Sequence, residues 1–135
     1  MYLVTYTMTA STTLVNASTF FGTPGSDSYR VAVYRGDLSN ATLVAQTTSV
    51  AATSTYNTKP FTVVSGQSLS FLVGSQITIG FAIAGGTATP AYFNSTSNGA
   101  LATFAAANYT GGFPAAVTGI TGQAATIIRI CLELA

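Results

Sequence analysis

Large apolar residues and small or polar residues alternate with a period of two along much of this chain. In residues 77–84 the large apolar side chains fall on one face and the small or polar ones on the other. The apolar face consists of Ile77, Ile79, Phe81 and Ile83. Side chains of a β-strand point alternately to its two faces, so this run predicts a half-buried strand. Residues 127–134 repeat the pattern up to the end of the chain, and we expect this last strand to be held within a sheet.

Six further segments are rich in Val, Thr, Tyr and Phe, which is typical of strands. They cover residues 2–8, 12–20, 28–35, 42–48, 61–64 and 68–72. Segments with Gly, Pro, Asp and Asn, which favour chain reversal, separate several of them. No stretch shows helical periodicity over three turns. Short strands at this spacing predict an all-β fold, an antiparallel and jelly-roll-like β-sandwich, with a narrower immunoglobulin-like sandwich as the alternative.

The chain of 135 residues fits a single domain over residues 1–135. Residues 85–123 differ from the rest because they are rich in Ala, Gly, Asn and Thr, with aromatic residues spaced through them. We expect two short strands and long loops in this segment. Loops of this length inside a compact domain are usually functional or packed against a partner, so we expect the interaction surface here.

Charged residues make up only 5% of the chain, against about 25% in ordinary proteins. The four cations are scattered and the net charge is +1, which argues against nucleic-acid binding, because that normally needs a cluster of Lys and Arg. Low net charge also removes self-repulsion between copies, and this favours a homo-oligomer or docking on a larger particle. The first eight residues lack the features of a signal peptide, and the apolar stretches are shorter than a membrane span. We therefore expect no signal peptide and no transmembrane segment.

Side chains that could perform catalysis are scarce. The chain has no His, and its carboxylates are Asp27, Asp37 and Glu133. The two aspartates could in principle pair for glycoside hydrolysis, but both fall in turn segments, where Asp ordinarily bonds nearby backbone. One cysteine, Cys131, without histidine cannot build a zinc site, and one carboxylate per loop would bind calcium weakly. We therefore predict a non-enzymatic protein with no cofactor and no metal, and a small buried or interface thiol at Cys131.

Two short motifs have simpler explanations than function. Arg35, Gly36 and Asp37 spell the tripeptide that animal integrins read, at the tip of a predicted hairpin. A Gly-Asp pair after a strand is ordinary turn chemistry, so we interpret the tripeptide as a turn. Triplets of the N-x-[ST] type, which begin at Asn16, Asn40, Asn94 and Asn108, are expected from a composition so rich in Asn, Ser and Thr.

The loop-rich segment contains candidates for contact with a partner or a glycan. Carbohydrate binding needs an aromatic face for the sugar ring, with amide or hydroxyl groups nearby. The residues that could supply both are Tyr92, Asn94, Asn98, Tyr109 and Phe113. The alternative is that these aromatic side chains pack in a core or in an interface.

Residues 28–35 and 41–47, separated by a polar turn, resemble a strand pair that recurs in β-sandwich modules of tailed-bacteriophage virion proteins and of bacterial surface proteins. A later strand after a turn belongs to the same pattern, as residues 74–85 show here. The resemblance covers about residues 28 to 85 and carries over no functional residues.

The resemblance implies a non-catalytic module of a phage particle. A capsid decoration (cement) protein is the expectation that fits a separate chain of this length, and a head or tail fibre domain is the other form. The implied partners are the major capsid protein or another virion protein, the implied location is the virion assembled in the host cytoplasm, and the favoured assembly is a homotrimer. A carbohydrate-binding or host-attachment module of a phage fibre or surface protein stays open as the alternative function.

Overall fold

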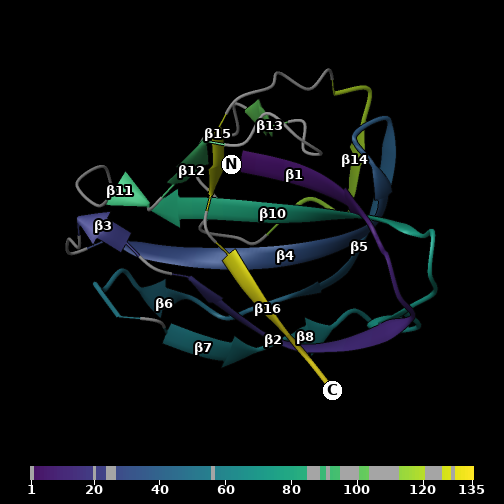
Figure 1. The fold of residues 1–135 in the computed structure, drawn as a ribbon, viewed down its shortest axis with the longest axis horizontal. Helices are drawn as coiled ribbons and strands as arrows, with labels where there is room; N and C mark the ends of the chain where they lie inside the picture. Colours follow the sequence, from purple (N-terminus) through teal and green to yellow (C-terminus); the bar gives the residue numbers. More distant parts are fainter. Residues whose placement is uncertain are drawn as a thin grey trace.

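The computed structural model describes residues 2–19, 21–23, 27–55, 57–84, 89–90, 92–94, 101–103, 113–120, 126–128 and 130–135. Every regular element in these ranges is a β-strand (Figure 1). In chain order the strands are β1 (Tyr2–Thr7), β2 (Thr12–Thr19), β3 (Phe21–Thr23), β4 (Ser28–Asp37), β5 (Asn40–Gln46), β6 (Val50–Ala51), β7 (Asn57–Pro60), β8 (Thr62–Val63), β9 (Ser70–Phe71), β10 (Gln76–Ala84), β11 (Thr89–Pro90), β12 (Tyr92–Asn94), β13 (Leu101–Thr103), β14 (Ala116–Thr118), β15 (Thr126–Ile128) and β16 (Ile130–Leu134). The prediction of an all-β fold is confirmed. None of the described segments forms a helix long and apolar enough to cross a bilayer.

The main sheet has the strand order β13-β1-β10-β4-β5-β14, with β6 paired to β4 and β8 paired to β5. All these pairs are antiparallel. The two longest strands, β4 and β10, lie side by side at its centre and pair from Ile77 opposite Arg35 to Ala84 opposite Ser28. Both are rich in Val, Ile, Phe and Tyr, the residue types that pack well on a pleated surface.

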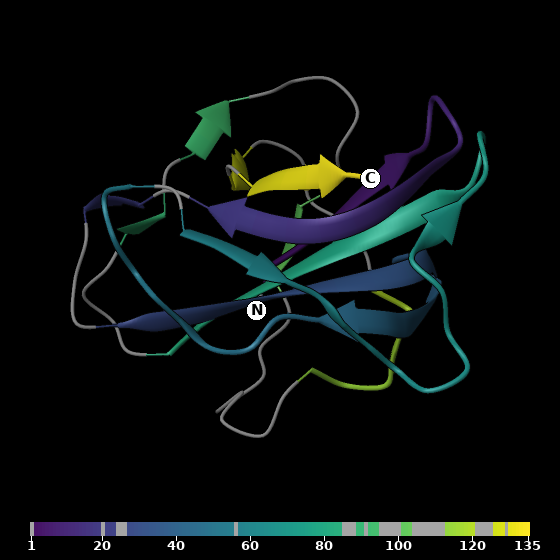
Figure 2. The same cartoon turned by 90° about the horizontal axis from the view of Figure 1, so that it is seen from below.

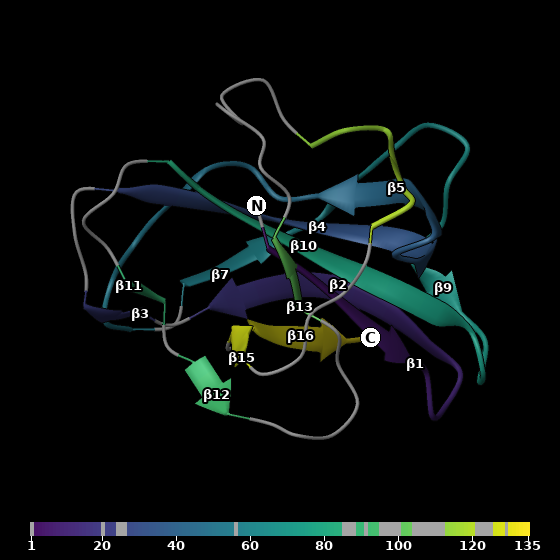
Figure 3. The same cartoon turned by 90° about the horizontal axis from the view of Figure 1, so that it is seen from above.

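A smaller second sheet has the order β16-β2-β7, with β9 paired to the other end of β2. Its strands form a layer apart from β4 and β5 when the molecule is seen from below (Figure 2) or from above (Figure 3). The chain crosses repeatedly between the sheets: β1 is in the main sheet, β2 in the second, β4, β5 and β6 in the main sheet, and β7 in the second. Two antiparallel layers joined by such crossings form a sandwich-like fold, as predicted from the strand pattern.

The inter-sheet core lies between the two layers. Strand β10 contributes Ile77, Ile79 and Phe81, all nearly inaccessible to solvent, so the predicted apolar face of this strand is confirmed. Strand β4 adds Val31 and Val33, and the second sheet supplies residues such as Leu14, Ala17 and Phe71. Tyr29 and Phe81 stack with their ring centroids 5.7 Å apart.

An outer core covers the opposite face of the main sheet. Residues 113–120 bring Phe113 and Val117 against Tyr34 and Leu3 on that face. The prediction that β10 is half-buried was therefore wrong. Its second face, which includes Thr78, is buried too, because residues 113–120 lie over it.

Two further expectations differ from the structure in detail. The predicted strand over residues 127–134 is divided into β15, which pairs with β12, and β16, which pairs with β2. Strand β16 is thus within a sheet, as expected, but at its edge. In residues 85–123, where we expected two short strands, the described parts contain four: β11, β12, β13 and β14.

Candidate functional site

The predicted contact residues are not gathered into one site by the described part of the structure. Tyr92 and Asn94 lie on β12, opposite Ile128 and Thr126 of β15. Asn98 and Tyr109 lie outside the described residues. A contact role for these four residues consequently stays a prediction.

Phe113 is the one predicted contact residue whose side-chain environment is described. Its ring is only 7% exposed and packs in the outer core. A Cβ atom added to Gly80 would lie 3.2 Å from the ring atom Cε1, which shows how closely the ring meets the sheet. The Phe113 N–H also donates to Oε1 of Gln46 at 3.3 Å. This environment favours the alternative that Phe113 serves packing.

The two aspartates considered for glycoside hydrolysis stand at opposite ends of the same strand. Asp27 immediately precedes β4 and Asp37 ends it. A strand rises about 3.3 Å per residue, so ten residues separate the carboxyl groups by roughly 30 Å. That is several times the separation of about 5–9.5 Å between the paired carboxyl groups of glycosidases.

Arg35 and Asp37 of the Arg-Gly-Asp tripeptide are both engaged within the chain. Arg35 Nη2 donates to the carbonyl oxygens of Ser68 and Ser70, at 2.9 and 3.1 Å. Asp37 Oδ1 accepts the N–H groups of Ser39 and Asn40, at 2.9 and 3.2 Å. These bonds lower the pKa of the Asp37 carboxyl, and the bond from Ser39 has the largest effect. Asp37 thus builds the β4–β5 turn, in agreement with our interpretation, whereas Arg35 is bonded to residues 68 and 70.

A third charged side chain is bonded on the outer face of the second sheet. Glu133 of β16 accepts a hydrogen bond of 2.7 Å from Asn16 Nδ2 on β2 and one of 3.2 Å from Thr58 Oγ1 on β7. The carboxylate therefore links β16, β2 and β7 of this sheet. No group of three or more His, Cys, Asp or Glu that could hold a metal ion occurs among the residues that the structure describes.

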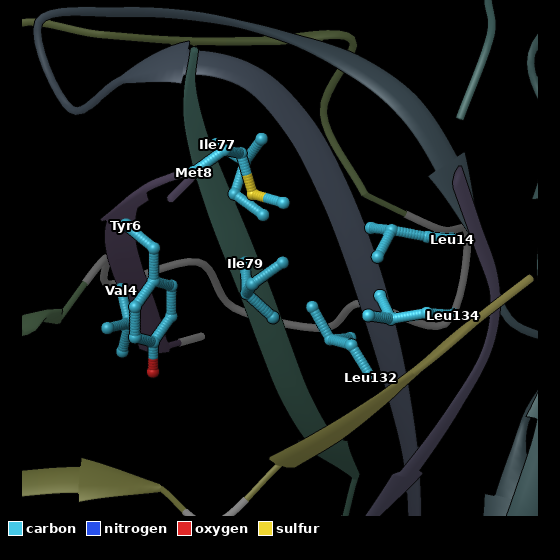
Figure 4. A pocket seen from close by; sticks show the side chains of 8 residues that line it. All are labelled: Val4, Tyr6, Met8, Leu14, Ile77, Ile79, Leu132 and Leu134. Carbon is cyan, nitrogen blue, oxygen red and sulfur yellow. The ribbon is translucent and has the colours of Figure 1, made fainter. Parts of the chain in front are cut away.

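An apolar groove opens between the edges of the two sheets (Figure 4). Its volume is about 290 Å³, and it is lined by Val4, Tyr6, Met8, Leu14, Ile77, Ile79, Leu132 and Leu134. Strand β1 forms one wall, β10 the floor, and β2 with β16 the other wall. Burial raises the pKa of the Tyr6 hydroxyl, which is the one polar group on these lining side chains. Such a groove binds through shape and apolar contact and offers no reactive group.

The groove was not predicted from the sequence, although the residue pattern of one wall is visible there. Val4, Tyr6 and Met8 alternate with Thr5 and Thr7, so the apolar face of β1 could be predicted. The other wall comes from residues about 130 positions away, at Leu132 and Leu134. Only the pairing of β16 with β2 brings them opposite β1.

Close to the groove, the turn of residues 72–75 between β9 and β10 presents two large apolar side chains to solvent. Leu72 is 72% exposed and Val73 is 62% exposed. Met8, which lines the groove, donates its N–H to Ser75 O and accepts the N–H of Gly74, both at 2.8 Å. The described part of the molecule therefore carries an apolar groove and an apolar projection near one of its ends.

No protein-family model, curated protein or solved structure matches this chain, so the case for its function rests on its own residues and geometry.

Proposed function

We propose that this chain is a non-enzymatic structural protein of a bacteriophage particle, a decoration (cement) protein that binds the assembled head and stabilises it. In this proposal the partner is the major capsid protein or another virion protein, and the chain acts as a homotrimer. The protein contributes contact surface, with no chemical step.

The observation that carries the proposal is that the chain has few charged residues and that several of them are bonded within the chain or buried. Of seven charged residues, Arg35, Asp37 and Glu133 are bonded within the chain, and Asp27 is buried. Arg35 and Glu133 are exposed, but charges are few, and the described surface also presents large apolar side chains such as Leu72, Val73 and Val63. A surface with so little net charge is poorly suited to attracting a charged ligand from a distance, but it can be buried against another neutral surface with few ions desolvated.

The resemblance to phage β-sandwich modules supports the proposal from another direction. Its three segments, at residues 28–35, 41–47 and 74–85, correspond to β4, β5 and β10. These strands are neighbours in the main sheet, in the order β10-β4-β5. The resemblance therefore concerns one contiguous structural unit.

Stabilisation of a head would follow from mass action. A protein that binds the assembled lattice and not its free subunits lowers the free energy of the assembled state, by about 2.7 kcal/mol per site at a free concentration 100 times the Kd. Contacts made by apolar and hydroxyl groups depend little on salt, because few counterions are released.

Co-sedimentation with purified phage heads tests the proposal. We expect the protein to pellet with intact heads and not with dissociated capsid subunits, and to raise the temperature at which the heads release their DNA. Binding should change by less than about threefold between about 50 and 500 mM salt. A protein that does not pellet with heads of the phage that encodes it, and is missing from purified particles, would contradict the proposal.

A further inference from the structure

The apolar groove leaves space beside the core of the sandwich that side chains of a second molecule can fill. Protein interiors are close-packed, and side chains that line an unfilled space lose the dispersion contacts they would have there. The groove is continuous with the inter-sheet core, because Leu14, Ile77 and Ile79 belong to both. An apolar side chain inserted from outside would therefore extend the core.

The turn of residues 72–75 has the properties of such an insert. Leu72 and Val73 are the two most exposed of the large hydrophobic side chains in the described part of the chain. The turn is also held in place, since Val73 N–H donates to Ser11 Oγ at 3.1 Å and Gly74 N–H donates to Met8 O at 2.8 Å. A held projection loses little conformational entropy on binding.

No charged side chain lines the groove or belongs to residues 72–75, although the Arg35 guanidinium lies over Phe71, the residue before the turn. Glu133 lies between Leu132 and Leu134 in β16, but its carboxylate is bonded to Asn16 and Thr58 on the outer face of the second sheet. Insertion of Leu72 and Val73 would consequently bury no ionised group of the turn or of the groove lining. Tyr6, which is 36% exposed, supplies the only hydroxyl among the lining side chains.

We infer that the groove of one copy receives the Leu72–Val73 turn of a second copy of this chain. Within one chain the turn is hydrogen-bonded to Met8 and Ser11, and neither Leu72 nor Val73 is among the residues that line the groove. Strand β10 starts at one end of the long axis, so the turn before it lies at that end (Figure 1), while the groove opens between β1 and β16 (Figure 4).

A contact between two different surfaces is heterologous and closes into a ring when the rotation between copies allows it. A trimer is a ring of this kind. The choice of three copies rests on the proposed function, whereas the contact between the groove and the Leu72–Val73 turn does not.

Light scattering on a size-exclusion column tests the contact. We expect the wild-type protein to elute as an oligomer, and the variant with both Leu72→Ser and Val73→Ser to dissociate, with an association constant lowered by roughly tenfold or more per buried side chain. The control is Val63→Ser, which removes an exposed apolar side chain from β8 and should leave the oligomer intact. All variants should retain the wild-type circular dichroism spectrum, since the three side chains are exposed.

Disulfide trapping identifies the two surfaces. Val73→Cys protein is mixed with Leu134→Cys protein, each with Cys131→Ser, so that a crosslink can form only between copies. We expect this mixture to form heterodimers faster than a mixture of Val73→Cys with Val63→Cys, because a disulfide needs Cα atoms within about 7 Å.

Three results would overturn the inference: a wild-type protein that is monomeric at high concentration, a double serine variant that keeps the wild-type mass, or crosslinking no faster than the control. A monomer whose groove instead binds a fluorescent alkyl probe would assign the groove to a small apolar ligand. Head binding is a separate measurement, so a protein that oligomerises through the groove but does not pellet with heads would contradict the proposed function alone.

Discussion

The guanidinium group of Arg35 lies over the ring of Phe71, with its Cζ atom 4.4 Å from the ring centroid. Arg35 is on β4 of the main sheet and Phe71 is on β9 of the second sheet, so this contact joins the two layers. The same guanidinium donates to the carbonyl oxygens of Ser68 and Ser70. Arg35 thus covers one end of the inter-sheet core, where Phe71 is almost fully buried.

Replacement of Arg35 should destabilise the sandwich. We expect Arg35→Ala to lower the free energy of unfolding by about 1–2 kcal/mol, from the loss of two charge-assisted hydrogen bonds at an exposed site and a cation–π contact. Arg35→Lys is the matched control, because it keeps the charge but lacks the planar guanidinium group. It should lower the free energy of unfolding by about half as much as Arg35→Ala. Denaturant unfolding followed by circular dichroism measures both. Equal stability of Arg35→Ala and the wild type would show that the contact contributes nothing.

Thr78 makes a buried polar connection across the main sheet. Its hydroxyl donates to Gly36 O and bonds Thr5 Oγ1, both at 2.8 Å, so Thr5 must donate in the second bond. Thr78→Val keeps the volume but removes both bonds, and we expect a loss of about 2 kcal/mol, against about 1 kcal/mol for Thr5→Val. Because the two residues share a bond, the double variant should lose less than the sum. Additive effects in urea unfolding would contradict this account.

The sequence predicted well those features that depend on local alternation. The apolar face of β10 and the β4–β5 hairpin follow from the order of residue types within a few positions. The burial of Phe113 and the position of Leu132 could not be predicted in this way, because each depends on pairing between segments far apart in the chain. The register shift between Val33 and Tyr34 is similar, since neither strand alone shows where the extra residue falls.

Gly36 occupies a position that no other residue fits. Its φ is +111°, and an added Cβ would lie 2.1 Å from Asn40 O. We expect Gly36→Ala to cost at least about 2 kcal/mol, because the turn must move as well as adopt a strained dihedral angle. Gly66→Ala is the control. Its φ is +78° with no atom within 4 Å of the added Cβ, so backbone strain alone should lower the free energy of unfolding by about 1 kcal/mol. If thermal unfolding gave the two variants the same stability, the clash at Gly36 would be absent.

The glycan alternative predicts binding that depends on exposed aromatic rings. We expect no binding of the protein on a glycan array if it is a decoration protein. A signal that Tyr92→Ala or Tyr109→Ala abolishes would instead support the carbohydrate-binding function. Phe113→Ala cannot serve in this test, because removal of a buried ring costs about 3–5 kcal/mol and would affect binding through unfolding.

The Asp37 carboxylate should make a small contribution to stability that depends on pH. Hydrogen bonds from the Ser39 and Asn40 N–H groups lower its pKa in the folded protein below the value of about 3.9 in an unfolded chain. Between these two pKa values the unfolded state binds more protons, so the contribution is fully present above the unfolded pKa and is lost as the pH falls through the folded pKa.

Asp37→Asn removes this titration while its side-chain oxygen can still accept the two N–H bonds. We expect the difference in unfolding midpoint between wild type and variant to be constant at neutral pH and to shrink below about pH 4. The rest of the chain is identical in the two proteins, so the difference isolates the side chain at position 37. A difference that stays constant down to pH values below the folded pKa would show that the turn does not distinguish the ionised from the protonated carboxyl.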